Sequence, residues 1–230
     1  YLPPIRQAFD DISASTAGLF GLKGESAVKL RAPISFSMLN LAERLARFNE
    51  EYPDIEVRIG SSLWADEVEA ESYDLDVRFG DGNWSGYHAD LLVNEGCIPV
   101  CSPDFDPMPN DLESMAKGKL ISVMGNEGAW LNAMNISGLT EMNSKRVLRA
   151  DSWLVAAELT SAGVGSLLML KSMAEFYINQ GRLINPVDFE LPVTQSHYLL
   201  RKEDHRRTKP EITILQQWLI NDYLRETTTG

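Results

Sequence analysis

The feature that most constrains the fold is an alternation of strand and helix patterns that begins at residue 28. Residues 28–34 (VKLRAPI) have the pattern of a strand, residues 39–52 (LNLAERLARFNEEY) that of a helix, and residues 55–59 (IEVRI) that of a second strand. The apolar face of the helix carries Leu41, Leu45, Phe48 and Tyr52. Two strands joined by a helix pair in parallel, so the pattern predicts an α/β fold.

The same alternation recurs after Pro107 and continues to the end of the chain. Further strands are predicted at residues 119–125, 145–150, 163–170 and 196–202. Further helices are predicted at residues 129–135, 152–162 and 173–181, and from Pro210 onward. Two polar breaks, 102–111 and 202–209, mark where the chain is expected to cross between subdomains.

Residues 35–38 (SFSM) lie where the first predicted strand gives way to its helix. Open α/β sheets bind ligands beyond the carboxyl ends of their strands, and the free N–H groups of a helix start attract anions. Ser35, Phe36, Ser37 and Met38 are therefore a candidate anion site. One of the two serines is also expected to cap the helix, and a cap does not exclude a ligand.

A second candidate is the loop at residues 79–86 (FGDGNWSG), which holds Gly80, Gly82 and Gly86. The dinucleotide-binding fingerprint requires Gly-x-Gly-x-x-Gly followed by a helix. Here the third glycine comes one residue late, and a strand-like stretch follows it. The nucleotide interpretation fails, and the residues of the loop alone favour an ordinary turn.

Composition sets outer limits on function. The chain has 230 residues, 44% of them hydrophobic, which suffices for one large domain or two small ones. Its net charge of -12 predicts that this chain alone repels a nucleic-acid backbone. No stretch has the roughly 18 consecutive apolar residues of a membrane helix, and the first residues do not resemble a signal peptide. We therefore expect a cytoplasmic location and no membrane partner.

Residues that carry catalysis or bind metals form no recognisable set. The histidines at 88, 197 and 205 lack the spacing of metal ligands, and no nucleophile motif is present. Cys97 and Cys101 lie four residues apart in a predicted strand, about 13 Å between Cα atoms, which is too far for a disulfide. We expect both cysteines to be packing residues, and we predict no enzyme activity, no metal and no cofactor.

The first 20 residues carry a short heptad stripe. Pro3 and Pro4 suit a first helical turn, and apolar residues follow at Ile5, Phe9, Ile12 and Leu19. The stripe either packs on its own domain or pairs with a second chain. The sequence favours neither alternative.

Four stretches, residues 30–59, 74–86, 97–103 and 180–192, resemble the effector-binding domain of LysR-type transcriptional regulators, particularly the branch of the glycine-cleavage activators. The resemblance spans nearly the whole chain. It implies two Rossmann-like α/β subdomains of the type-two periplasmic-binding-protein fold, joined by two crossing strands, with a small-molecule cleft between them. Residues 1–20 would then be the linker helix.

The resemblance also implies subdomain limits and partners. Residues 27–101 and 201–230 would form one subdomain, and residues 102–200 the other. Expected partners are a small-molecule effector and further copies of the chain, in a homodimer or tetramer. Promoter DNA would be bound only through an N-terminal winged helix-turn-helix, which these 230 residues do not contain.

From the resemblance we expect ligand contacts at strand ends, at helix starts and at the rim of the cleft. The expected residues are Ser35, Phe36, Ser37, Met38, Ser61, Ser62, Gly80, Asp81, Met124, Gly125, Asp151, Ser152 and Trp153. Many relatives carry a basic residue near the position of Asp81. Its absence here favours an effector with an amine over a strongly anionic one.

The competing class is a periplasmic solute-binding protein of the same fold. The lack of a leader and the heptad stripe argue against it. A small α/β enzyme would need a reactive set of residues, which the sequence does not provide.

Overall fold

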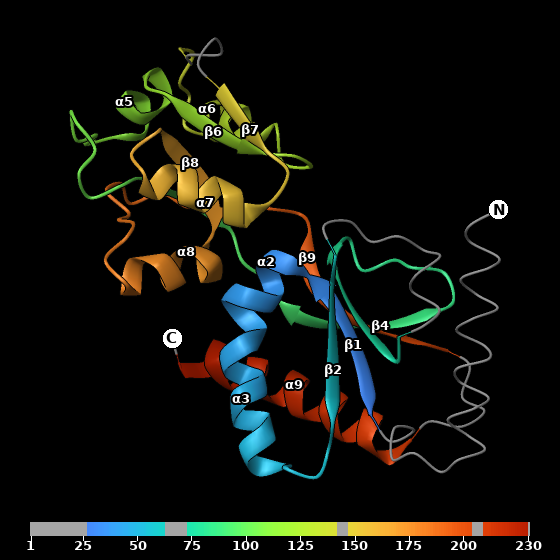
Figure 1. Cartoon of the computed structure of the whole chain (residues 1–230). Helices are drawn as coiled ribbons and strands as arrows, with labels where there is room; N and C mark the ends of the chain where they lie inside the picture. The colour runs from blue at the N-terminus through green and yellow to red at the C-terminus, as the bar shows by residue number, and fades with distance from the viewer. Residues whose placement is uncertain (1–26, 63–72, 142–146, 204–208, 230) are drawn as a thin grey trace, which may run out of the picture.

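The computed structural model describes residues 27–62, 73–141, 147–203 and 209–229, with side chains as far as Arg225. The predicted linker helix and its apolar stripe lie outside these residues. No helix in the described ranges is long and apolar enough to cross a membrane. Figure 1 shows two α/β units, one above the other, that are joined by connecting segments next to β9.

The first sheet has five strands in the order β2-β1-β3-β9-β4. Its strands are β1 (Val28–Pro33), β2 (Val57–Ser62), β3 (Leu75–Gly80), β4 (Tyr87–Val93) and β9 (Ser196–Lys202). β1 pairs in parallel with both β2 and β3, whereas β9 is antiparallel to β3 and β4. The parallel pair β1 and β2, joined by a helix, confirms the predicted strand–helix–strand unit.

The second sheet has four strands in the order β5-β8-β6-β7. They are β5 (Cys97–Val100), β6 (Leu120–Val123), β7 (Val147–Ala150) and β8 (Ser166–Leu170). The helices of this unit are α5 (Leu112–Lys117), α6 (Ala129–Ile136), α7 (Trp153–Ser161) and α8 (Lys171–Asn179). Every residue of β6 and β8 is buried, which requires cover on both faces of the sheet.

The helix between β1 and β2 begins earlier than the sequence predicted. It runs from α2 (Ile34–Phe36) through a π-helical segment, η1 (Ser37–Leu41), into α3 (Ala42–Glu51). Its N-cap is Pro33, with φ -55° and ψ 140°, and no side chain caps the helix. The prediction that Ser35 or Ser37 is the cap is therefore wrong, because proline already fixes the backbone angle that a helix start needs.

The first unit buries its apolar side chains between the sheet and two helices. Phe48 of α3 is 1% exposed and lies with its ring centroid 5.4 Å from that of Trp218 in α9 (Pro210–Thr229). The helix predicted from Pro210 onward is α9, which is buried at Ile212, Leu215, Leu219 and Tyr223 and partly buried at Trp218. Packing against α3 and the sheet thus orders both helices and fixes the end of β1 from which the helix starts.

The chain passes between the two sheets twice. It leaves β4 for β5 through residues 94–96, and it returns to β9 through residues 192–195. The two passages lie together, because Ser196 Oγ donates to Asn94 Oδ1 at 3.2 Å. Cys97 and Leu191 also exchange backbone hydrogen bonds of 2.9 and 2.8 Å. The subdomain limits at residues 101 and 200 lie near these passages and remain predictions.

Candidate functional site

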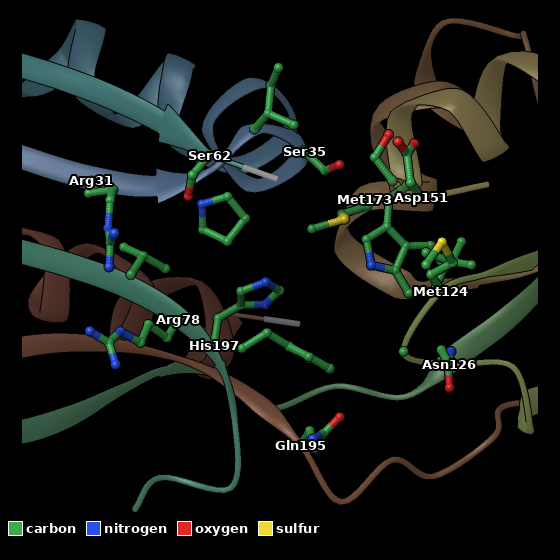
Figure 2. A pocket seen from close by; sticks show the side chains of 18 of the residues that line it. Arg31, Ser35, Ser62, Arg78, Met124, Asn126, Asp151, Met173, Gln195 and His197 are labelled. Carbon is green, nitrogen blue, oxygen red and sulfur yellow. The ribbon is translucent and has the colours of Figure 1, made fainter. Parts of the chain in front are cut away.

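A cavity of about 410 Å³ lies between the two units, a volume typical of small-molecule sites. Its wall from the first unit includes Pro33, Ile34, Ser35, Ser62, Phe79 and His197. Its wall from the second unit includes Met124, Gly125, Asn126, Asp151, Ser152 and Trp153. Figure 2 shows these walls facing each other, with Ser35 and Ser62 on one side and Asp151 and Met124 on the other.

On the first wall, the helix that starts at Ile34 points its N-terminus toward the cavity, since Pro33, Ile34 and Ser35 all line it. The first N–H groups of a helix have no partner within the helix and carry partial positive charge. The Ser35 hydroxyl is 3.3 Å from the N–H of Leu154, from which it accepts a hydrogen bond. Ser35 therefore links the two units at the mouth of the cavity.

On the second wall, α7 also begins at the cavity. Ser152 is its N-cap, and its side chain accepts a hydrogen bond from the N–H of Val155 at 3.4 Å. Asp151 precedes it with an exposed side chain. Met124 and Gly125 follow β6, where Gly125 has a φ of +84° that residues other than glycine rarely adopt.

Sequence reasoning missed a buried charge cluster on the sheet side of the cavity. Arg31 of β1 donates to both carboxylate oxygens of Asp76 in β3, at 2.8 and 2.7 Å. Arg78 donates to the same carboxylate at 2.7 Å. All three residues are at most 5% exposed and all line the cavity. The cluster, Arg31, Asp76 and Arg78, carries a net charge of about +1 at neutral pH.

A signal for this cluster was present in the sequence. Arg31, Asp76 and Arg78 stand among apolar residues in two neighbouring strands, and the parallel register places Arg31 directly opposite Asp76. Charged residues are rarely fully buried unless they are paired, so charges in two neighbouring buried strands indicate an ion pair.

His197 forms the middle of the cavity wall. It is 3% exposed and its ring lies between Phe36 and Phe79, with centroid distances of 4.2 and 4.8 Å. Burial lowers the pKa of His197 to about 3, so the imidazole is neutral at physiological pH. Its Nδ1 has no hydrogen-bond partner among the residues that the structure describes. The sequence had suggested only a surface or strand residue at this position.

Seven of the predicted contact residues line the cavity: Ser35, Ser62, Met124, Gly125, Asp151, Ser152 and Trp153. Four others near the helix start do not. Phe36 packs into the core at 0% exposure, and Met38 points to solvent at 54%. Ser61 Oγ donates to Ser37 Oγ at 3.2 Å, on the side of these elements that does not line the cavity.

The glycine-rich loop also lies outside the cavity lining, so Gly80 and Asp81 do not contribute to it. A side chain at Gly80 would place its Cβ 2.7 Å from the ring of Trp84. The carboxylate of Asp81 accepts a hydrogen bond from the N–H of Asn83 at 3.0 Å, as in an Asx turn. The loop is a turn in which the ring of Trp84 lies next to Gly80. The centroid of this ring is 5.7 Å from that of Tyr198.

The cavity has no metal-binding character. Across the described ranges, no three His, Cys, Asp or Glu residues lie close enough together to hold a metal ion. Cys97 and Cys101 are buried free thiols, consistent with packing roles. The polar groups of the cavity are suited to holding a small molecule by hydrogen bonds and charge.

Comparison with known proteins identifies the family. Residues 24–221 match the family model described as the LysR substrate binding domain. The transcriptional activator AmpR of Rhodobacter capsulatus is 28% identical over 221 residues, which cover 94% of this chain and 74% of that protein. The glycine cleavage system transcriptional activator of Escherichia coli K12 is 26% identical over 223 residues, which cover 96% and 72%.

Solved structures agree in fold. The effector domain of AmpR from Pseudomonas aeruginosa superposes with a TM-score of 0.78 at 22% identity, covering 87% of this chain and 97% of that one. The full-length virulence activator AphB of Vibrio cholerae gives a TM-score of 0.67 at 20% identity, covering 95% and 78%. The predicted two-subdomain, periplasmic-binding-protein-like fold is confirmed. This chain belongs to the LysR family, and it is the effector-binding domain of a LysR-type transcriptional regulator.

Proposed function

We propose that this domain senses a small metabolite that bears both a carboxylate and an amine, and that the metabolite binds in the cavity between the subdomains. The distribution of charge in the cavity carries the proposal. The cluster of Arg31, Asp76 and Arg78 leaves net positive charge on one side, and Asp151 is the carboxylate on the other. Figure 2 shows Arg31 and Arg78 at the opposite end of the pocket from Asp151.

The carboxylate of the effector would bind at the start of the helix at Ile34. The N–H groups there, the hydroxyls of Ser35 and Ser62, and the field of the arginines all favour a negative group. A helix start contributes about 0.3–1 kcal/mol, and hydrogen bonds to a charged group contribute about 1.5–3 kcal/mol each. The hydrogen bonds therefore dominate.

The amine of the effector would meet Asp151. The absence of a basic residue near Asp81 favoured an effector with an amine, but Asp81 does not line the cavity, whereas Asp151 does. Among the described residues, two arginines and two aspartates line the cavity, so their charges cancel. A neutral lining with separated charges suits a dipolar ligand better than a multiply charged anion.

Ligand binding would act by changing the relative orientation of the subdomains. Ser35 accepts from the N–H of Leu154 across the mouth of the cavity, and both residues belong to helix starts at the site. A ligand that hydrogen-bonds to both walls favours the orientation in which both contacts are made. In the whole regulator this shift would pass to a cytoplasmic dimer or tetramer and to its DNA-binding domains.

The test is a thermal-shift screen of the 20 common amino acids and of the matching acids without an amine, followed by calorimetry. Asp151→Asn should weaken binding of an amino acid hit about 10- to 100-fold, because it removes one charged hydrogen bond. It should leave the matching acid without an amine nearly unchanged.

Asp81→Asn is the matched control, because Asp81 is an exposed aspartate outside the cavity lining. The placement of the site is wrong if both variants bind the hit as tightly as the parent chain. The solute-binding alternative is not favoured, because family model and relatives both indicate a transcriptional regulator.

A further inference from the structure

A second, smaller cavity of about 140 Å³ adjoins the effector cavity. The two cavities share three lining residues, Phe79, Asn126 and Gln195. Figure 2 shows Asn126 and Gln195 on the side of the main pocket away from Ser35 and Ser62. An effector whose carboxylate lies at the helix start would therefore extend its other end toward the second cavity.

The polar lining of the second cavity is uncharged. Asn126, Asn132 and Gln195 contribute amides, and Thr194 contributes a hydroxyl. No Asp, Glu, Lys, Arg or His of the described ranges lines this cavity. Within the part of the chain that the structure describes, no hydrogen bond engages the side chains of Asn132, Thr194 or Gln195. These groups are free to bind a ligand.

Burial and two nearby carboxylates disfavour a negatively charged ligand group in this cavity, as the thiol of the lining residue Cys97 shows. Burial, with the nearby carboxylates of Glu95 and Glu190, raises the pKa of the Cys97 thiol to about 12, so the thiol stays protonated. Neither carboxylate lines the cavity, and both already accept hydrogen bonds, Glu95 from Ser172 and Glu190 from the N–H of Gly96. A positive group therefore finds no carboxylate partner in the lining either.

We propose that the second cavity is a subsite for an uncharged hydrogen-bonding group, an amide or a hydroxyl, at the end of the effector remote from its carboxylate. This inference rests on the proposed function, because it takes the main cavity as the site of the carboxylate. It narrows the effector to molecules with a charged end and a neutral polar end. The subsite also brings the effector against residues 192–195, the passage by which the chain returns to the first sheet.

Calorimetry with six probes tests the subsite. L-Glutamine, L-glutamate and L-norleucine share one charged end and differ at the other, which is an amide, a carboxylate or a methyl group. Glutaramate, glutarate and hexanoate form the same series without the amine. In at least one series the amide should bind 10-fold or more tightly than both of its partners.

Variants assign the preference to the subsite. Asn132→Leu should reduce the preference for the amide over the methyl group to less than 3-fold. Asn135→Leu is the matched control, because Asn135 lies on the same helix, is exposed and lines neither cavity; it should retain the full preference.

Each remaining outcome counts against the subsite. Equal binding of the three end groups within each series, tighter binding of L-glutamate than of L-glutamine and L-norleucine, or a preference that survives Asn132→Leu would overturn the subsite while leaving the proposed function intact. Binding of none of the six probes would also overturn it. The wider amino acid screen tests the proposed function separately, so the two failures are distinguishable.

Discussion

At the scale of single residues, the cavity wall contains a buried histidine and a buried cluster of charged side chains. His197 is a neutral imidazole between two phenylalanine rings, and Asp76 serves two buried arginines. Both arrangements cost free energy that ordinary apolar packing would not. Both lie on the cavity wall, and each makes a measurable prediction.

The histidine predicts a pH-dependent stability. In the unfolded chain it binds a proton near its ordinary pKa of 6.5, whereas in the folded chain it does so only near pH 3. The neutral imidazole makes its full contribution to the free energy of unfolding above pH 6.5, and this contribution is lost as the pH falls toward 3. Between pH 6 and 4.5, His197 should make the free energy of unfolding of the parent chain fall by about 1.4 kcal/mol per pH unit. This contribution should be absent in His197→Phe.

Urea denaturation at several pH values measures this slope. His88→Phe, which removes an exposed histidine, is the reference for loss of a histidine elsewhere. A His197→Phe variant with the same dependence on pH as the parent chain would show that burial does not hold the imidazole neutral.

The charge cluster predicts a large loss of stability on neutralisation. Asp76→Asn leaves two buried guanidinium groups without their shared carboxylate, and breaking a buried pair costs about 3–5 kcal/mol. The matched control is Glu56→Gln, since Glu56 pairs with Arg58 where both side chains are about half exposed, 48% and 53%. That change should cost about 0–1 kcal/mol in the same denaturation experiment.

At the scale of elements, the strands and helices follow from periodicity. The pattern of 196–202 predicted β9 with the same limits, and Leu45, Phe48 and Tyr52 predicted the packed face of α3. The start of the helix after β1 was missed because Pro33 replaced a side-chain cap. Seven of the thirteen expected contact residues line the cavity, at strand ends and helix starts, and their contact with a ligand stays a prediction. The cavity is also lined by Arg31, Arg78 and His197, which strand register and tertiary packing bring together.

Helix α8 joins the two subdomains near residues 94–96, where the chain passes from the first sheet to the second. Ser172, at the start of α8, donates its hydroxyl proton to Glu95 Oε1 at 2.8 Å and accepts from Asn40 Nδ2 at 3.3 Å. Asn40 lies in η1 of the first unit, and Glu95 lies in the passage between β4 and β5. Ser172 thus connects the helix that starts at the cavity, the passage and the second subdomain.

Ser172→Ala should destabilise this connection by about 1–3 kcal/mol, because it leaves Asn40 and Glu95 without a hydroxyl partner. Hydrogen exchange should become faster in the first turn of α8. Asn179→Ala, at the exposed far end of the same helix, is the control and should leave that turn unchanged. Unchanged exchange in Ser172→Ala would mean that apolar packing alone holds α8 in place.

At the scale of the whole molecule, the net charge determines whether this chain can bind DNA by itself. The 230 residues carry a net charge of -12, so this chain by itself should not bind promoter DNA. Fluorescence polarisation with a labelled duplex at about 50 mM salt measures this, because electrostatic binding is strongest at low salt. Salt-sensitive binding by this chain would contradict the expectation that a separate domain contacts DNA.

The central claim is that the effector lies between the subdomains with its carboxylate at the helix start. A crystal structure of the chain with the tightest amino acid from the screen tests this most directly. We expect ligand density in the cavity, with the carboxylate about 3 Å from the N–H groups at Ile34 and Ser35 and the ammonium group near Asp151. Ligand density elsewhere, with this cavity filled only by water, would contradict it.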